Sequence, residues 1–248
     1  MTSSEKQFIL RLADDCMILG QRLGEWCGHG PVLEQDIALT NIALDLIGEA
    51  RAYYHFIGVS EGKKEDDYPM LRLEREFRNC LLVEQPNGHF GDTIIRQFLF
   101  DTYHYFMLEG LCRSNVKTLA EIAEKSVKEA RYHLNFSSEW VKRLGDGTSE
   151  SHDKIQVSLN DIIEYYDELF TPVDYELECI ELGVCQDFKQ VETKAKAYAK
   201  EIFTLATLEM PENYFSRTGG KSGIHSEYIG FILTELQYMQ RAYPNMTW

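Results

Sequence analysis

The chain carries long stretches in which apolar residues recur every three or four positions, the spacing of one face of an α-helix. The first predicted helix covers about residues 5–26, and three more are predicted at about 33–57, 92–112 and 117–144. The second and third are apolar on most sides, which indicates burial, and Asp92 is the expected N-cap of the third. The apolar positions of the first helix follow the pattern of a bundle seam: Ile9, Leu12, Cys16, Leu19, Leu23 and Trp26.

The lengths of the connections predict the topology. Short links join the first helix to the second and the third to the fourth, so each pair is expected to be antiparallel. Residues 58–91 separate the second helix from the third and include a short helix expected near 71–80. A long crossover at this point is typical of ferritin-like bundles and is absent from simple up-and-down bundles.

Further helices are predicted after residue 145, at about 153–170, 174–182, 187–208 and 225–241. We therefore expect an all-α, ferritin-like helical bundle that forms a single domain over residues 1–248. Its core bundle is expected at about 5–145, and additional C-terminal helices at about 151–241.

Composition narrows the class of protein. A net charge of −15 argues against nucleic-acid binding and against docking on an anionic membrane. No apolar run of 18 residues is present, and the polar start of the chain lacks the apolar core of a signal peptide. The six cysteines form no C-x-x-C motif, so reduced thiols in the cytoplasm are expected.

Polar residues interrupt three of the apolar helices at helical spacing. Because buried polar groups need partners, these lines are expected to face one another in a polar chamber at mid-bundle. The second helix contributes Asn41, Asp45 and Glu49, the third contributes Gln97, Asp101 and His104, and the fourth contributes Ser126, Ala130 and His133 with Glu129 beside them.

A ferritin-like di-metal site takes a Glu from each of two helices and a Glu-x-x-His from each of the other two. The sequence contains no Glu-x-x-His. The residues three positions before the seven histidines include one acid, Asp101, which precedes His104. We therefore predict no catalytic, cofactor-binding or metal-binding residue in this chain.

Three interpretations of the polar chamber remain open. The favoured one is a self-satisfied network of hydrogen bonds and ion pairs. The second is a degenerate single-metal site on Asp101 and His104, and the third is a functional di-iron centre, which the first helix disfavours because Asp15 and Glu25 lie at the margin of its seam. The network would join Asp45, Glu49, Asp101 and Glu129 to Arg51, His104, Arg131 and His133.

A glycine-rich loop at residues 217–225 carries Arg217, Lys221 and His225. It is not a P-loop, because Tyr214 stands where the first glycine belongs and no strand precedes it. The loop is expected to hold an anion, to fit a partner, or simply to connect two helices.

Several longer motifs resemble one family over nearly the whole chain, namely the PaaC-type subunits of bacterial phenylacetyl-CoA epoxidases. The motifs cover residues 21–29 (QRLGEWCGH), 44–51 (LDLIGEAR), 82–88 (LVEQPNG), 128–133 (KEARYH) and 217–221 (RTGGK). The resemblance implies a ferritin-like fold and a structural, non-catalytic subunit. It also implies a PaaA-like partner that holds the di-iron site and oxidises phenylacetyl-CoA with O2.

The resemblance further implies a reductase subunit that uses NADPH, flavin and an iron–sulfur cluster. Leu46 and Glu49 stand where a catalytic relative would have Glu-x-x-His, and Ala130 stands three positions before His133. Two alternatives from other classes are a self-contained metal-binding oxidase and an acyl-CoA-binding subunit that uses the 217–225 loop. The sequence leaves homodimer formation open.

Overall fold

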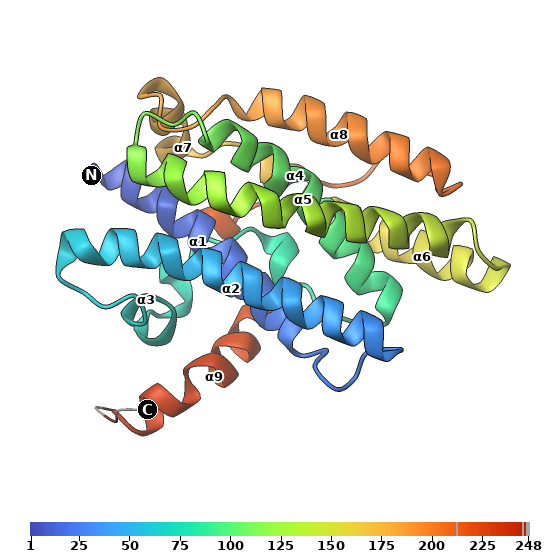
Figure 1. Ribbon diagram of the computed structural model, residues 1–248, viewed down its shortest axis with the longest axis horizontal. Helices are drawn as coiled ribbons and strands as arrows, with labels where there is room; N and C mark the ends of the chain where they lie inside the picture. Colours follow the sequence, from blue (N-terminus) through green and yellow to red (C-terminus); the bar gives the residue numbers. More distant parts are fainter. Residues whose placement is uncertain (212, 245, 247–248) are drawn as a thin grey trace. The chain divides into compact units, whose positions relative to one another are not determined.

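A computed structural model describes residues 1–211, 213–244 and 246, and every regular element within them is a helix (Figure 1). The predicted all-α fold class is therefore confirmed for the described part of the chain. Contacts divide the chain into two compact units. Unit 1 comprises Met1–Pro86 and Gly219–Trp248, and unit 2 comprises Asn87–Thr218.

Unit 1 is built on an antiparallel pair of long helices, α1 (Ser3–Gly24) and α2 (Leu33–Glu61) (Figure 1). A capping box starts α1: Thr2 Oγ1 accepts from the Glu5 amide at 3.1 Å, and a Glu5 carboxylate oxygen accepts from the Thr2 amide at 2.6 Å. The remaining elements are the short α3 (Asp67–Leu71), three 3-10 turns at Glu74–Glu76, Leu81–Glu84 and Gly220–Ser222, and the last helix, α9 (Glu227–Ala242).

The seam predicted for α1 is buried from Ile9 to Leu23, whereas Trp26 lies beyond the helix and is half-buried. The prediction that α2 is buried nearly all round is wrong. Its Leu39, Ile42 and Leu46 side is buried, but Ile37 is 49% exposed and Leu44 is 62% exposed. The helix buries the side that packs on α1 and presents apolar residues on its outer side.

Unit 2 is centred on α4 (Phe90–Leu111), which is buried along most of its length. It packs against three other helices of the unit, and its antiparallel neighbour α5 follows after a short link (Figure 1). The other helices are α5 (Lys117–Gly145), α6 (Ser149–Ile162), α7 (Asp174–Glu181) and α8 (Phe188–Leu205).

Several predicted boundaries need correction. The N-cap of α4 is His89, whose ring nitrogen accepts from the Asp92 amide at 3.2 Å, while Asp92 accepts from the His89 amide at 2.8 Å as the reciprocal partner. The short crossover helix lies at Asp67–Leu71 rather than near 71–80, because the chain extends at Arg72. The helix predicted at 153–170 ends at Ile162 and continues as two 3-10 turns.

The predicted C-terminal helices do not stay together. Helices α6 and α8 pack on α4 and α5 in unit 2, whereas α9 packs on α1 and α3 in unit 1. The assignment of residues 1–248 to a single domain stays a prediction. Among the described residues, no helix is both long and apolar enough to cross a membrane.

Candidate functional site

Asp101 is the centre of the buried polar residues of unit 2. It lies on α4 and is 1% exposed. The Gln97 amide donates to Oδ1 at 2.7 Å, and the Ser137 hydroxyl of α5 donates to Oδ2 at 2.7 Å. Both carboxylate oxygens therefore have hydrogen-bond donors within the unit, and the carboxylate is tied to two neighbouring helices.

Burial raises the pKa of Asp101 to about 6, against the opposing effect of the nearby His133 charge. Hydrogen bonds from Ser137 and Gln97 also favour the ionised form, and they compensate burial only in part. A carboxyl group with this pKa gains or loses its proton within the physiological range, unlike an exposed aspartate.

His104 and His133 are also buried, with exposed fractions of 3% and 2%. The His104 ring packs on Phe100 with the centroids 5.0 Å apart, and both imidazoles act electrostatically on Asp101. Glu129 is only half-buried on α5. In unit 2 the predicted core set therefore narrows to Asp101, His104 and His133, with Gln97 and Ser137 as their hydrogen-bonding neighbours.

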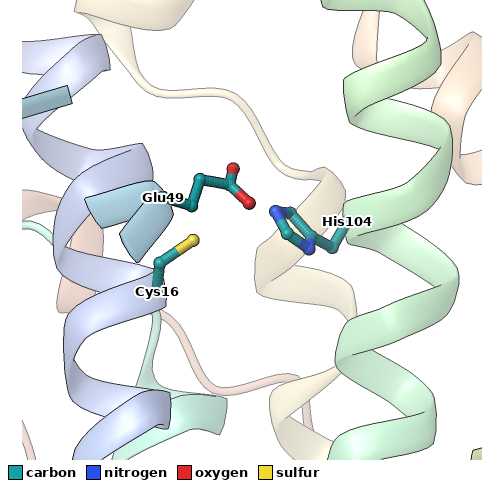
Figure 2. A group of neighbouring side chains, drawn as sticks. All are labelled: Cys16, Glu49 and His104. Carbon is teal, nitrogen blue, oxygen red and sulfur yellow. The ribbon is translucent and has the colours of Figure 1, made fainter. Parts of the chain in front are cut away.

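In unit 1 the corresponding buried carboxylate is Glu49 of α2. The Tyr53 hydroxyl donates to Glu49 Oε1 at 3.0 Å. The Cys16 thiol of α1 lies beside the Glu49 carboxylate, within 4.8 Å (Figure 2). Burial raises the pKa of Cys16 well above its ordinary value, and the Glu49 charge raises it further, so the thiol stays protonated near neutral pH.

Other members of the predicted network lie elsewhere. Asn41 is exposed and Asp45 is half-buried, so the polar line of α2 reaches the interior only at Glu49. The Arg51 side chain is 72% exposed and pairs with Glu65 at 2.6 Å. Arg131 is exposed and donates to the Tyr105 hydroxyl at 3.1 Å. The predicted arginine partners are therefore surface residues, because each side chain reaches a carboxylate or hydroxyl close to solvent.

Sequence reasoning placed the carboxylates of the first helix at the margin of its seam, and the structure corrects this. Asp14 is 0% exposed and Asp15 is 2% exposed. Asp15 accepts from the Cys80 amide at 2.7 Å and pairs with Arg11 at 3.3 Å. Burial nevertheless raises the pKa of Asp15, because the Arg11 charge compensates only part of the lost hydration. The four-residue spacing of Arg11 and Asp15 was the available signal for this pair.

The residues of the 217–225 loop do not form a common exposed surface. Arg217 belongs to unit 2, where its side chain is 53% exposed and pairs with Glu164 at 2.7 Å. Lys221 belongs to unit 1 and is only 1% exposed. The His225 side chain is fully buried in unit 1 against Glu84. Two of the three cations expected to meet an anion are therefore directed into the protein.

These donors do not fit a carboxylate-bridged di-iron centre, which needs four carboxylates and two imidazoles. Leu46 and Ala130 occupy positions where metal-binding glutamates would stand, and neither side chain has a donor atom. Hard iron also prefers carboxylates to a protonated thiol such as Cys16. The absence of any cofactor stays a prediction, because Cys16 and Glu49 are both metal-donor types and His104 (Figure 2) adds an imidazole in unit 2.

Long helices, short links within helix pairs, a long crossover and polar residues within apolar helices define a protein of the ferritin-like helical class. Comparison with known proteins gives the family. The chain matches the family described as Phenylacetic acid catabolic protein (PaaA_PaaC) over residues 2–248, and it belongs to that family. It is similar to the C-type subunit of 1,2-phenylacetyl-CoA epoxidase from Escherichia coli (strain K12), with 44% identity over 245 residues. The match covers 97% of this chain and 98% of that protein, which confirms the family resemblance of the motifs.

Proposed function

We propose that this chain is the C-type, non-catalytic subunit of a phenylacetyl-CoA epoxidase. The oxidation itself would take place in a PaaA-like subunit that holds the di-iron site, and a reductase subunit would supply electrons. The observation that carries the proposal is the donor chemistry of the core. Leu46 and Ala130 replace metal-binding carboxylates in a chain that is similar over nearly its full length to a C-type epoxidase subunit.

The proposed role is mechanical. The chain would support the catalytic subunit and hold its iron-binding helices in place, because small errors in the position of ligands degrade catalysis. Its own core is suited to rigidity, since buried carboxylates tie neighbouring elements together. Asp101 joins α4 to α5, and Asp15 joins α1 to the crossover at Cys80.

An apolar stripe on α2 supports a partner-binding role. Leu33, Ile37 and Leu44 are 70%, 49% and 62% exposed, and their spacing of four and seven residues puts them on one side of the helix. Large exposed apolar side chains gathered on one surface are typical of protein–protein contacts. We propose this stripe as part of the surface that meets another subunit.

The proposed location is the cytoplasm. All six cysteines are free thiols, and Cys27 is exposed. An exposed unpaired thiol is typical of a protein that stays in a reducing compartment.

Co-expression with a PaaA-like catalytic subunit tests the proposal. We expect phenylacetyl-CoA epoxidation to require both chains, and we expect iron to purify with the catalytic subunit. Metal analysis of this chain alone is the decisive control. About two irons per chain, the content of a di-iron centre, would favour the self-contained oxidase instead.

Variants of the polar core separate a structural from a catalytic role. Glu49→Gln and His133→Gln should leave the turnover of the assembled complex nearly unchanged once equal amounts of complex are compared. Loss of an outer-shell partner of a metal ligand typically costs about 10–100-fold in activity or affinity. A loss of that size in a complex that still assembles would contradict the non-catalytic assignment.

The acyl-CoA-binding alternative can be tested separately by calorimetry with phenylacetyl-CoA. Lys221 is buried and His225 is engaged by Glu84, so we expect no binding to this chain alone. Binding by the wild type that disappears in Lys221→Ala would support the alternative.

A further inference from the structure

His225 lies at the entry to α9 and is held from both sides of its ring. Its Nδ1 lies 2.6 Å from Glu84 Oε1, and its Nε2 lies 3.1 Å from the Phe77 carbonyl oxygen. Both the imidazole and the Glu84 carboxylate have side chains that are 0% exposed. A carbonyl oxygen only accepts hydrogen bonds, so Nε2 must carry a hydrogen.

Glu84 receives three further donors. The Asn79 side-chain amide donates to Oε1 at 2.9 Å, and the Ser226 amide and hydroxyl donate to Oε2 at 2.9 and 2.6 Å. This many donors stabilises the ionised carboxylate. One additional proton lies between Oε1 and Nδ1, and it belongs on Nδ1, because imidazole is the stronger base. His225 is therefore a buried imidazolium paired with a buried carboxylate.

We propose that Glu84 and His225 form a proton-dependent clamp that holds α9 and its entry segment on unit 1. With Nε2–H committed to Phe77, loss of the Nδ1 proton brings a nitrogen lone pair against a carboxylate oxygen at 2.6 Å. Two acceptors at that distance repel each other. The ring must then move, and Ser226, the N-cap residue of α9, moves with it.

Other charges around the clamp are matched within unit 1. Asp14 pairs with Arg72, Asp15 pairs with Arg11, and the Arg22 guanidinium donates to the Glu84 carbonyl. Arg78 donates to the carbonyl of Phe77, the same group that His225 contacts. Lys221 acts electrostatically on Asp15. Once His225 is neutral, the clamp carries one excess buried negative charge, which is costly in a low-dielectric interior.

The direction of the pH effect follows from linkage. Burial opposes protonation of His225, but Glu84 overcomes this and raises the pKa of the imidazole above its ordinary value. A raised folded-state pKa stabilises the closed clamp fully below about pH 6.5, the ordinary histidine value. That stabilisation is lost as pH rises through the folded-state pKa. The clamp is therefore closed in neutral or mildly acidic solution and opens under alkaline conditions.

Hydrogen exchange on the intact chain tests the clamp. After correction for intrinsic rates, protection of the amides of α9 should fall between pH 6 and 9, by about tenfold for each unit of pKa elevation, while amides of α5 in unit 2 keep theirs. NMR of the His225 ring should show two N–H groups at pH 7. Protection of α9 that does not change with pH, or a His225 that titrates at or below 6.5, would overturn the proposal.

Glu84→Gln provides a second variant whose outcome does not depend on losing the contact. A glutamine amide can donate to neutral Nδ1 while Nε2–H stays on Phe77, so α9 should remain protected and its pH dependence should disappear. His55→Gln is the matched control, because His55 also pairs with a glutamate but its side chain is 65% exposed. A pH dependence that persists in Glu84→Gln, or that disappears in His55→Gln, would contradict the clamp.

Discussion

Arg72 donates to both carboxylate oxygens of Asp14, although 58 residues separate them in the chain. The Tyr54 hydroxyl and the Arg78 amide donate to the same carboxylate. The Arg72 guanidinium also packs over the Phe77 ring, 4.2 Å from its centroid. This pair therefore fastens the crossover segment to α1 inside unit 1.

Asp14→Asn should destabilise the chain strongly. It removes the charge opposite a guanidinium that is only 11% exposed, and leaving a buried charge uncompensated typically costs about 3–5 kcal/mol. Urea unfolding measures the change. Glu121→Gln, which breaks an exposed pair with Lys117, is the control and should have a much smaller effect. Equal losses in the two variants would show that Asp14 contributes no more than a surface charge.

Asp101 should make folding less favourable as pH rises from about 4 to 6. Its pKa is about 6 in the folded protein and about 3.9 in an unfolded chain, so the folded state binds the proton more tightly. Its stabilising effect is complete below the unfolded value and lost as pH rises through the folded one. Unfolding midpoints at several pH values should show a flatter profile in Asp101→Asn, whereas the exposed Asp153→Asn should match the wild type. A wild-type profile in Asp101→Asn would disprove this role.

The buried Cys16 thiol should be inert in the native protein. Its pKa is raised well above the ordinary value and its side chain is 1% exposed, so both thiolate formation and reagent access are suppressed. Mass spectrometry after brief alkylation at neutral pH should find Cys27 modified and Cys16 unmodified, with Cys16 reacting only after denaturation. Modification of native Cys16 at a rate near that of Cys27 would show that its surroundings open readily.

Gly223 and Gly62 form a matched pair for backbone strain. Both have left-handed φ values, +80° and +67°, and alanine in this conformation costs about 1–2 kcal/mol. An added Cβ at Gly62 meets open space, whereas at Gly223 it would lie 2.5 Å from the Arg75 carbonyl oxygen. Gly223→Ala should therefore cost about 1–3 kcal/mol more than Gly62→Ala. Similar unfolding free energies for the two variants would rule out the predicted clash.

The long helices and the family could be predicted from the sequence, because helical periodicity and extended motifs are local signals. The polar contacts that fasten unit 1 could not. Asp14 meets Arg72 across 58 residues and Glu84 meets His225 across 141, and no local pattern specifies such partners. The same limit explains the error on α2: periodicity identified an apolar helix but could not tell a side that packs on α1 from one that stays exposed.

Unit 1 contains both ends of the sequence, since α9 packs on α1 and α3 while unit 2 occupies the middle of the chain. Domains generally fold in order as they leave the ribosome. This connectivity reverses the expected order here: α1 and α2 are synthesised first, but their unit is completed only after the final helix has been released. Until then Glu84 lacks His225, and a nascent chain stalled before residue 219 would expose a half-built unit to chaperones and proteases.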